Sequence, residues 1–249
     1  MSGDDQRSGK GTSEDDQWSG EDTIRFDPHV HTAASHDARG SVADVLQQAD
    51  DGGLAAIGIT DHDTVDGAQR ALDIQHRYDV LVVPGVEIST ADGHLLGLGI
   101  SEQPPLGRSL VATVEWVRDR GGIAVVPHPF QRSRHGVGKS LLANCDGVEV
   151  FNAWAVTGIQ NRRAAAVAGR IGQPGLGASD AHRPETVGIA ATELTVDGPV
   201  TVQRILDAIA AGRCRAVGRS IRLRTSLRTY ATALSQFIRH RPRANSTTQ

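Results

Sequence analysis

Short apolar runs alternate with longer amphipathic segments along most of the chain, starting at Ile24. The short runs predict strands at 24–27, 54–59, 80–83, 95–100, 123–126, 147–151, 175–178 and 188–195. The longer segments carry apolar residues at helical spacing and predict helices at 41–52, 66–77, 109–120, 160–171 and 201–211. A strand followed by a helix, many times over, is typical of a parallel sheet or a β/α barrel.

Local signals support the ends of these helices. Ser41 followed by Asp44 fits a capping box that opens the first helix. Paired glycines at 52–53 and 121–122 end the first and third helices, as expected of residues that tolerate a left-handed backbone. A further segment, 221–240, has apolar residues at helical spacing and predicts an amphipathic helix with an arginine-rich face.

Composition divides the chain into three parts. Its 249 residues, 39% of them hydrophobic, fit a single α/β domain with a full core. Residues 1–22 hold seven acids among many Gly and Ser, and we expect a disordered acidic tail there. The barrel is expected over 23–218, followed by an arginine-rich helix and tail over 219–249.

Arginine is concentrated at the C-terminal end. Nine arginines and no acid follow position 212, whereas residues 23–212 carry 22 acids against 15 Lys and Arg. Three interpretations stay open: contact with nucleic-acid phosphates, an amphipathic helix on an anionic membrane, or a basic face packed on the acidic body.

We expect a cytoplasmic protein without a transmembrane segment. No run approaches the roughly 20 apolar residues that span a bilayer, and the N-terminus has no apolar stretch that resembles a secretory signal. The two cysteines, Cys145 and Cys214, stand in unrelated contexts and are expected to be small packing residues.

Histidines and carboxylates follow five of the predicted strands directly. The segments are 27–31 (DPHVH), 60–63 (TDHD), 84–87 (PGVE), 127–129 (PHP) and 179–182 (SDAH). In a β/α barrel the C-terminal ends of the strands converge on one face, where active sites are built. Residues far apart in the sequence are therefore expected to meet.

The spacing of these residues favours a metal site. His29 and His31 are two apart on an extended chain, so their side chains share one face, and Asp180 and His182 repeat this spacing. Imidazole and carboxylate without thiolate suit zinc, manganese or iron. Each pair alone has an ordinary explanation, such as a turn or the cap of the helix at 66–77. Burying the whole set would be costly without a cation.

The segments DPHVHTAASHD, GITDHDT, PGVEIST with GHLLGLGI, VVPHPF and ASDAH resemble, in this order, the PHP (polymerase and histidinol phosphatase) superfamily over about residues 24–218. The chain is more similar to its stand-alone phosphoesterases than to the domains embedded in DNA polymerases. The resemblance implies a distorted, TIM-like (β/α)7 barrel with a metal site at the C-terminal ends of the strands.

The resemblance also implies two or three divalent ions (Mn, Zn or Fe). Position 37 is Asp, where some relatives have His. The first ion is expected on His29, His31, Glu87 and Asp180, a second on Glu87, His94 and His128, and a third on Asp37, His62 and His182. The residues expected to be catalytic are His29, His31, Glu87, Asp180 and His182.

The expected activity is that of a metal-dependent phosphoric ester hydrolase of the phosphatase or exonuclease type, in which a hydroxide between the metals attacks phosphorus. The expected substrate is a nucleotide or the 5′ end of a short oligonucleotide. Three alternatives stay open: a histidinol-phosphate-type phosphatase, a metal-dependent amide or ester hydrolase, and a non-catalytic nucleic-acid-binding metal domain.

A basic segment directly after His128 offers partners for substrate phosphate. We predict substrate contacts from Arg132, Arg134, His135 and Lys139, and from His36 and Asn152 near the motif positions. The alternative for the basic segment is a solvated loop. Asp61, Asp63 and Glu149 are either partners of metal ligands or residues without a role in the site, and the sequence does not decide between the two.

Overall fold

The computed structural model describes residues 23–155 and 157–221. The predicted acidic tail over 1–22 lies outside the described residues. So does the predicted helix over 221–240, apart from Ile221, and with it six of the nine C-terminal arginines. The acidic tail and the C-terminal helix therefore stay predictions.

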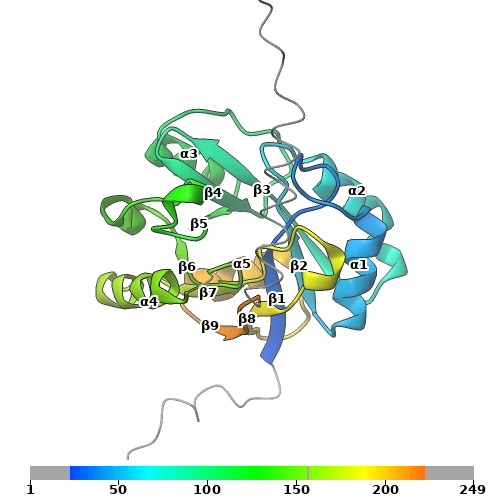
Figure 1. Ribbon diagram of the computed structural model, residues 1–249. Coiled ribbons are helices and arrows are strands. Elements are labelled where there is room, and N and C mark those ends of the chain that lie inside the picture. The colour runs from blue at the N-terminus through cyan, green and yellow to red at the C-terminus, as the bar shows by residue number, and fades with distance from the viewer. Residues whose placement is uncertain (1–22, 156, 222–249) are drawn as a thin grey trace, which may run out of the picture.

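Within the described residues, one mixed sheet of nine strands runs in the order β7-β6-β5-β4-β3-β2-β1-β8-β9. The strands are β1 (Thr23–Val30), β2 (Ala56–Ile59), β3 (Leu81–Thr90), β4 (Gly93–Leu98), β5 (Ile123–Val126), β6 (Gly147–Asn152), β7 (Gly175–Ala178), β8 (Ala190–Thr195) and β9 (Cys214–Gly218). The sheet curls until its two ends come together, so it is a nearly closed barrel (Figure 1).

Helices lie around the outside of this barrel (Figure 1). They are α1 (Val42–Asp51), α2 (Asp66–Ile74), α3 (Leu110–Arg118), α4 (Ile159–Ile171) and α5 (Val202–Ala210). The five predicted helices are confirmed, except that the second ends in a 3-10 turn, η2 (Gln75–Arg77). Further 3-10 turns are η3 (Arg132–Arg134), η4 (Lys139–Asn144) and η5 (Pro184–Thr186).

The predicted capping box is present at the start of α1. The Ser41 hydroxyl accepts from the backbone N–H of Asp44, and the Asp44 carboxylate accepts from the backbone N–H of Ser41 at 3.0 Å. The helix ends at Gly52, and Gly53 follows with φ 64°. Such a cap contributes about 1 kcal/mol and fixes where the chain leaves β1 to begin the helix.

The sheet is not uniformly parallel, which distorts the barrel. β1, β2 and β3 are parallel, as are β5, β6 and β7. β4 is antiparallel to both of its neighbours, and β8 is antiparallel to β1 and β9. The predicted distorted TIM-like barrel is confirmed. Its sheet has nine strands among the described residues, whereas the apolar runs predicted eight and the family resemblance implied seven.

β3 continues where the sequence predicted its end. Up to Pro84 it pairs in parallel with β2, and from Gly85 to Thr90 it pairs with β4 as an antiparallel hairpin. A Cβ at Gly85 would meet the carbonyl oxygen of Gly97 at 2.7 Å, so the close approach of β4 requires glycine there. Glu87 therefore stands on a rigid strand instead of on the loop that the Pro-Gly pair suggested.

β1 meets two different partners along one edge. Its first half, from Thr23 to Phe26, pairs with β8, whereas its far end bridges in parallel to Ala181 after β7. Asp27 lies at this fork, where its Oδ1 accepts from Ser179 N at 3.0 Å and its Oδ2 from Gly188 N at 2.9 Å. Complete burial raises the pKa of Asp27 to about 6.

The barrel closes through a side chain instead of a full strand ladder. The Thr192 hydroxyl of β8 donates to Gly177 O at 2.8 Å and accepts from Gly177 N at 3.0 Å. A Cβ at Gly177 would collide with the Ala191 carbonyl oxygen, so glycine lets β7 approach this closely. The junction links the strand that leads into Asp180 to the antiparallel pair β8–β9.

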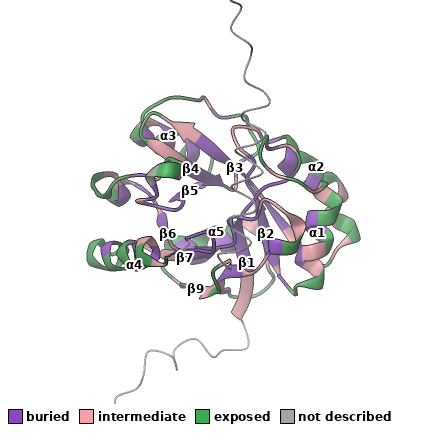
Figure 2. Cartoon of the chain, viewed as in Figure 1, coloured by how far each residue is buried: buried purple, intermediate pink, exposed green. Residues whose placement is uncertain are grey.

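Apolar residues fill the barrel and the layer under its helices (Figure 2). Inside the barrel, residues from β1, β3, β4, β5 and β8 pack with α5, which closes the end where the parallel strands begin. Two further clusters lie under α1 and α2 and under α3 and α4. Each fully buried Leu or Ile contributes about 1.5–3 kcal/mol. This core therefore gives a rigid base to the open end of the barrel, which lies opposite α5.

Candidate metal centre

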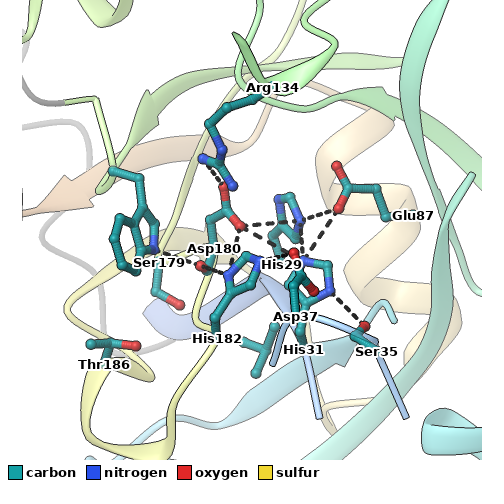
Figure 3. A network of polar contacts seen from close by, with 12 residues as sticks. His29, His31, Ser35, Asp37, Glu87, Arg134, Ser179, Asp180, His182 and Thr186 are labelled. Atoms are coloured by element: carbon teal, nitrogen blue, oxygen red, sulfur yellow. Dashed lines mark hydrogen bonds and ion pairs between the residues drawn. The ribbon is translucent and has the colours of Figure 1, made fainter. Parts of the chain in front are cut away.

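Histidines and carboxylates from three strands converge at the open end of the barrel (Figure 3). His29 lies in β1 and His31 directly follows it, Glu87 lies in β3, and Asp180 lies in the segment after β7. His29 Nε2 lies 2.9 Å from His31 Nε2 and 3.1 Å from Glu87 Oε2. It lies 3.6 Å from Asp180 Oδ1. These four side chains are buried and direct their polar atoms toward a common centre.

Asp180 shows most clearly that this centre fits a cation. Its Oδ1 is buried and has no hydrogen-bond donor within the described part of the chain. The nearest groups are ring nitrogens of His29, His31 and His182, at 3.5–3.7 Å. A buried acceptor without a donor is costly. Lone pairs of imidazole and carboxylate directed at one point are the donors that divalent transition metals take.

A second group surrounds the other oxygen of Glu87. Glu87 Oε1 lies 2.8 Å from His94 Nδ1 and 2.9 Å from His128 Nε2. Glu87 Oε2 lies within 3.3 Å of His62 Nδ1 and 3.2 Å of His31 Nε2. One carboxylate therefore stands between two sets of imidazoles, and each of its oxygens would be available to a different ion.

A third group lies closer to solvent. Asp37 Oδ2 is 3.2 Å from His182 Nε2 and 3.4 Å from His62 Nε2. Ligand atoms of His31, Asp37, His62 and His182 all lie within 4.8 Å of one another. All nine residues predicted as ligands thus gather in one place, and Asp37 lies among them.

Partners behind the rings set which nitrogen faces the centre. His29 Nδ1 donates to Glu149 Oε1 at 2.7 Å, and His182 Nδ1 donates to the carbonyl oxygen of Asp180 at 2.9 Å. His31 Nδ1 lies 3.1 Å from the Ser35 hydroxyl. Because a ring whose Nδ1 carries the proton keeps a lone pair on Nε2, these contacts leave the Nε2 atoms free to coordinate.

Two residues whose role the sequence did not decide lie among these partners behind the rings. Asp61 is buried and accepts from the Ser35 hydroxyl at 2.8 Å, so it fixes the partner of His31. Glu149 is buried against His29. Asp63, by contrast, accepts from Ser89 N at 2.7 Å and lines the cavity over the centre.

Charge and burial shift the acid–base properties of the centre. The pKa of His29 lies well above its usual value: burial opposes the charged form, but Asp180, Glu87 and Glu149 outweigh it. The pKa of Glu87 lies well below its usual value, since His29 and the other imidazoles overcome the cost of burial. The pKa of Asp180 is also lowered, because Arg134 and His29 overcome burial. The pKa of His128 is lowered by burial and Arg134.

The backbone itself is strained at the site. His128 has φ 31° and Asp180 has φ 53°, both in the left-handed region that non-glycine residues rarely adopt. Each such residue costs on the order of 1–3 kcal/mol and persists only where its surroundings hold it. Trp154 supplies one such restraint, since its Nε1 donates to the carbonyl oxygen of Asp180 at 2.7 Å.

A cavity of about 370 Å³ opens over the cluster. Three of the predicted substrate contacts line it: His36, Arg134 and His135. Arg134 reaches the cluster directly, with Nη1 at 2.5 Å from Asp180 Oδ2 (Figure 3), and the His135 ring stacks on that of His94 with centroids 5.0 Å apart. Arg134 and His135, in the middle of the basic segment, therefore face the centre.

The other predicted substrate contacts have different places. Lys139 is exposed at the start of η4 and is not part of the cavity lining. Asn152 is fully buried behind Asp180, to whose Oδ2 it donates at 2.9 Å, so its side chain supports the cluster instead of reaching the cavity. The Arg132 side chain lies outside the description.

Sequence analysis missed the support from Ser35, the cavity-lining Ser89 and Ser133, and the role of Trp154. Serine gives little signal because it is common in loops. The one signal for Trp154 is chemical, because a buried indole N–H needs a hydrogen-bond partner.

Two of the C-terminal arginines pack on the acidic body. Arg213 Nη1 lies 2.7 Å from Asp197 Oδ2, and Arg215 Nη2 lies 2.6 Å from Glu193 Oε2. For these two residues the packing interpretation holds. Cys145 and Cys214 are buried, and burial raises the pKa of their thiols to about 12 and about 11, as expected of packing residues.

Known proteins share these motifs. Residues 27–133 match the PHP domain and residues 158–214 the PHP-associated family. An uncharacterised protein of Methanocaldococcus jannaschii is 33% identical over 149 residues, which are 55% of this chain and 87% of the relative. This chain belongs to the PHP family. The predicted PHP resemblance is thereby confirmed, and at the level of the family so is metal-dependent phosphoester hydrolysis.

Two further similar proteins extend the comparison. A phosphoribosyl 1,2-cyclic phosphate 1,2-diphosphodiesterase of Eggerthella lenta is 38% identical over 85 residues, about a third of each chain. The structure of a two-domain protein of Bacteroides vulgatus, described as containing a predicted PHP-like metal-dependent phosphoesterase, superposes with TM-score 0.67 at 19% identity, over 84% of this chain and 69% of that one.

No helix among the described residues is long and apolar enough to cross a membrane.

Proposed function

We propose that this PHP protein hydrolyses phosphate esters of nucleotides or the 5′ ends of short oligonucleotides with two or three Mn, Zn or Fe ions. One observation carries the proposal: the buried Oδ1 of Asp180 has no donor within the described residues and faces only imidazole nitrogens. A cation resolves this arrangement. A protein nucleophile is not required by it.

The assignment of ligands follows the three groups. We assign a first ion to His29, His31, Glu87 and Asp180, a second to Glu87, His94 and His128, and a third to Asp37, His62 and His182. When bound, divalent ions supply Lewis acidity, which lowers the pKa of a water molecule toward neutrality and offsets charge on a phosphoryl group.

The chain's own residues bind and orient the substrate. Arg134 lies beside the cluster and presents a guanidinium that matches two phosphate oxygens. Asn152 and Arg134 both contact Asp180 Oδ2, so Asp180 keeps one orientation while its Oδ1 faces the centre. His36 and His135 on the cavity wall add polar contacts for the part of the substrate beyond the phosphate.

Three features favour a nucleotide or oligonucleotide. The relative from Eggerthella lenta is named for a cyclic phosphate of phosphoribose. A cavity of about 370 Å³ lies in the range that small ligands occupy. Ile221 N donates to Ala153 O at 2.8 Å, next to the end of β6, so the last described residue lies near the open end of the barrel, and the sequence that follows it is rich in arginine. We also propose the cytoplasm as the compartment, on the sequence grounds given above.

The alternatives differ in what they require of the basic segment. An amide or ester hydrolase has no need for a guanidinium at the cluster, whereas Arg134 lies 2.5 Å from Asp180 Oδ2. A histidinol-phosphate-type phosphatase uses the same site and differs only in substrate. A non-catalytic nucleic-acid-binding domain would bind without turnover. The observed contact of Arg134 favours a phosphate ester.

A phosphate-release screen in manganese tests the proposal. The substrates are nucleoside monophosphates and bisphosphates, 5′-phosphorylated oligonucleotides and histidinol phosphate, with an aryl amide and an aryl ester beside them. His29→Ala is the inactive variant. His76→Ala is its matched control, because His76 is exposed on η2 and is neither a proposed ligand nor part of the cavity lining.

We expect the wild type and His76→Ala to release phosphate equally and His29→Ala to release almost none. Equal release by all three would mean a contaminating activity and would end the proposal. A chain truncated after Ile221 should turn over a nucleoside monophosphate normally but lose salt-dependent affinity for oligonucleotides. If its oligonucleotide affinity is unchanged, the arginine-rich segment has no part in substrate binding.

A further inference from the structure

Glu149 is a buried acid that is not among the nine proposed ligands. It stands on β6, its side chain is fully buried, and it is not part of the cavity lining. No Lys or Arg within the described residues is paired with it by a direct ion pair. A buried carboxylate in such a place needs hydrogen-bond donors to offset the loss of water.

Three donors surround this carboxylate. Its Oε1 accepts from His29 Nδ1 at 2.7 Å. Its Oε2 accepts from the backbone N–H of His128 at 2.7 Å and from Asn152 Nδ2 at 2.9 Å. Each donor belongs to a residue that is a proposed ligand or touches one.

The second contact acts on backbone conformation. His128 sits at φ 31°, and its N–H points at Glu149 instead of at a strand neighbour. A charge-assisted hydrogen bond of 2.7 Å helps hold this left-handed turn. This backbone turn directs His128 Nε2 toward Glu87 Oε1, which lies 2.9 Å away.

The third contact passes through an amide. The Asn152 amide nitrogen donates both to Glu149 Oε2 and to Asp180 Oδ2, each at 2.9 Å. The amide oxygen of Asn152 accepts from Trp154 N at 3.0 Å, which fixes which end of the amide faces the two carboxylates. Glu149 thereby influences Asp180 as well.

We propose that Glu149 is a positioning residue that orients ligands of the first and the second metal ion at once, through His29, His128 and the Asn152–Asp180 contact. The proposal rests on the ligand assignment of the proposed function. It explains why a carboxylate is required: an ionised carboxylate only accepts, and three donors point at it. A glutamine of the same shape would turn an N–H₂ group toward one of them.

Ser35 offers a useful contrast. Its hydroxyl is also buried behind the cluster, but it contacts the ring of His31 at 3.1 Å and the backbone N–H of His62 at 2.9 Å. It therefore acts on the first and third groups and does not reach His94 or His128, which belong to the second. Substitutions at 149 and 35 should weaken different combinations of ions.

The experiment is a cobalt(II) titration of the metal-free full chain, followed by its visible absorption and by calorimetry. The variants are Glu149→Gln and Ser35→Ala, with Glu193→Gln as the matched control, because Glu193 pairs with Arg215 away from the cluster. We expect Glu149→Gln to weaken two cobalt-binding steps by about 10–100-fold each. Ser35→Ala should leave the step assigned to the second ion unchanged, and Glu193→Gln should behave as wild type.

Thermal unfolding of the metal-free proteins separates positioning from general stability. We expect Glu149→Gln to unfold, without metal, close to the wild-type temperature. A lower unfolding temperature with unchanged cobalt affinity would overturn the proposal, and so would weakening of a single step. If Glu149→Gln does not fold, Asn152→Ala tests the contact to Asp180: one step should weaken, and two unchanged steps would overturn the proposal.

These readouts are independent of turnover. A wild-type protein that binds cobalt but hydrolyses no phosphate ester would end the proposed function and leave the role of Glu149 intact. A wild-type protein that binds no cobalt would overturn both.

Discussion

The inner and outer parts of the cluster are built differently. The side chains of His29, His31 and Asp180 are fully buried and that of Glu87 is 1% exposed. In the outer group, Asp37 is 33% exposed. His29 and Glu87 lie within strands, and His31 and Asp180 each follow the end of a strand within two residues. Asp37 lies in the turn that comes further along the chain after β1. The inner part is thus held before any ion arrives, and the outer part is shaped to admit water and substrate.

The inner and outer parts also differ in the partners that hold their side chains from behind. Inner imidazoles are fixed from behind by Glu149 and by Ser35, which itself donates to Asp61. Asp37 has contacts only with His62 and His182 among the ion pairs of the described residues. Because ligands with a supporting partner lose less freedom on binding, we expect tight inner ions and a more readily exchanged outer ion.

The most damaging test removes the residue that joins the inner groups. Glu87→Gln keeps the shape of the side chain but removes its charge and replaces one carboxylate oxygen with an NH2 group. The side chain can then no longer offer an oxygen to each of two ions. We expect kcat/KM in manganese to fall by roughly a thousandfold, since several kcal/mol of charge stabilisation are lost. Circular dichroism should show an intact fold. A loss below about tenfold would mean that Glu87 is not shared.

A milder effect is expected for the outer group. Asp37→Asn should reduce activity by about 10–100-fold, the range found when a partner of a metal site is lost. Excess manganese should recover part of the activity, because the outer ion is proposed to exchange. A loss as large as that of Glu87→Gln, with no recovery in excess metal, would show that the two parts are held equally tightly.

Acidification should weaken the inner site before it harms the fold. The raised pKa of His29 means that its imidazole stays protonated in the metal-free protein at neutral pH, so an ion must displace that proton. Metal affinity should therefore rise with pH below this pKa, by about tenfold per unit for one proton. Calorimetry in buffers of different ionisation enthalpy measures the proton released. Zero release at pH 7 would contradict the raised pKa.

The smallest effect concerns the cavity wall. Arg134→Lys keeps a positive charge beside Asp180 but loses the planar group that can hold two phosphate oxygens. We expect KM for a nucleoside monophosphate to rise by about fivefold to tenfold, equivalent to about 1 kcal/mol, while kcat changes less. Steady-state kinetics over a range of substrate concentrations separate the two. An unchanged KM would place the phosphate elsewhere.

The barrel and the convergence of its histidines and carboxylates were predictable because both depend on local patterns. Helices such as α1 and α4 have amphipathic spacing and clear ends, and polar residues placed just after buried strands meet in any barrel of this kind. His29 and His31 could be placed on one face from their spacing alone. The family resemblance then supplied the proposed assignment of these residues to three ions.

What the sequence missed depends on contacts between distant segments. Pro84 and Gly85 look like the end of a strand, yet β3 passes through them as it exchanges β2 for β4. β9 falls within the range expected for the barrel but was not predicted as a strand, and its Arg215 is paired with Glu193 only after folding. Such pairings are invisible to a window of neighbouring residues.

Asn152 illustrates the same limit within the site. Its position next to a motif suggested contact with substrate, but the direction of a side chain at the end of β6 is decided by Glu149, Asp180 and Trp154. A polar residue near a cavity can face either way, and only the three-dimensional partners choose.

The left-handed backbone of Asp180 has a practical consequence for trapping complexes. Alanine at 180 would remove the carboxylate but keep an unfavourable φ of 53°, whereas glycine adopts that angle without steric cost. Glycine is therefore the better choice for an inactive protein that keeps its shape. Crystals of such a variant, soaked with an intact phosphate ester, offer a direct route to seeing what this enzyme recognises.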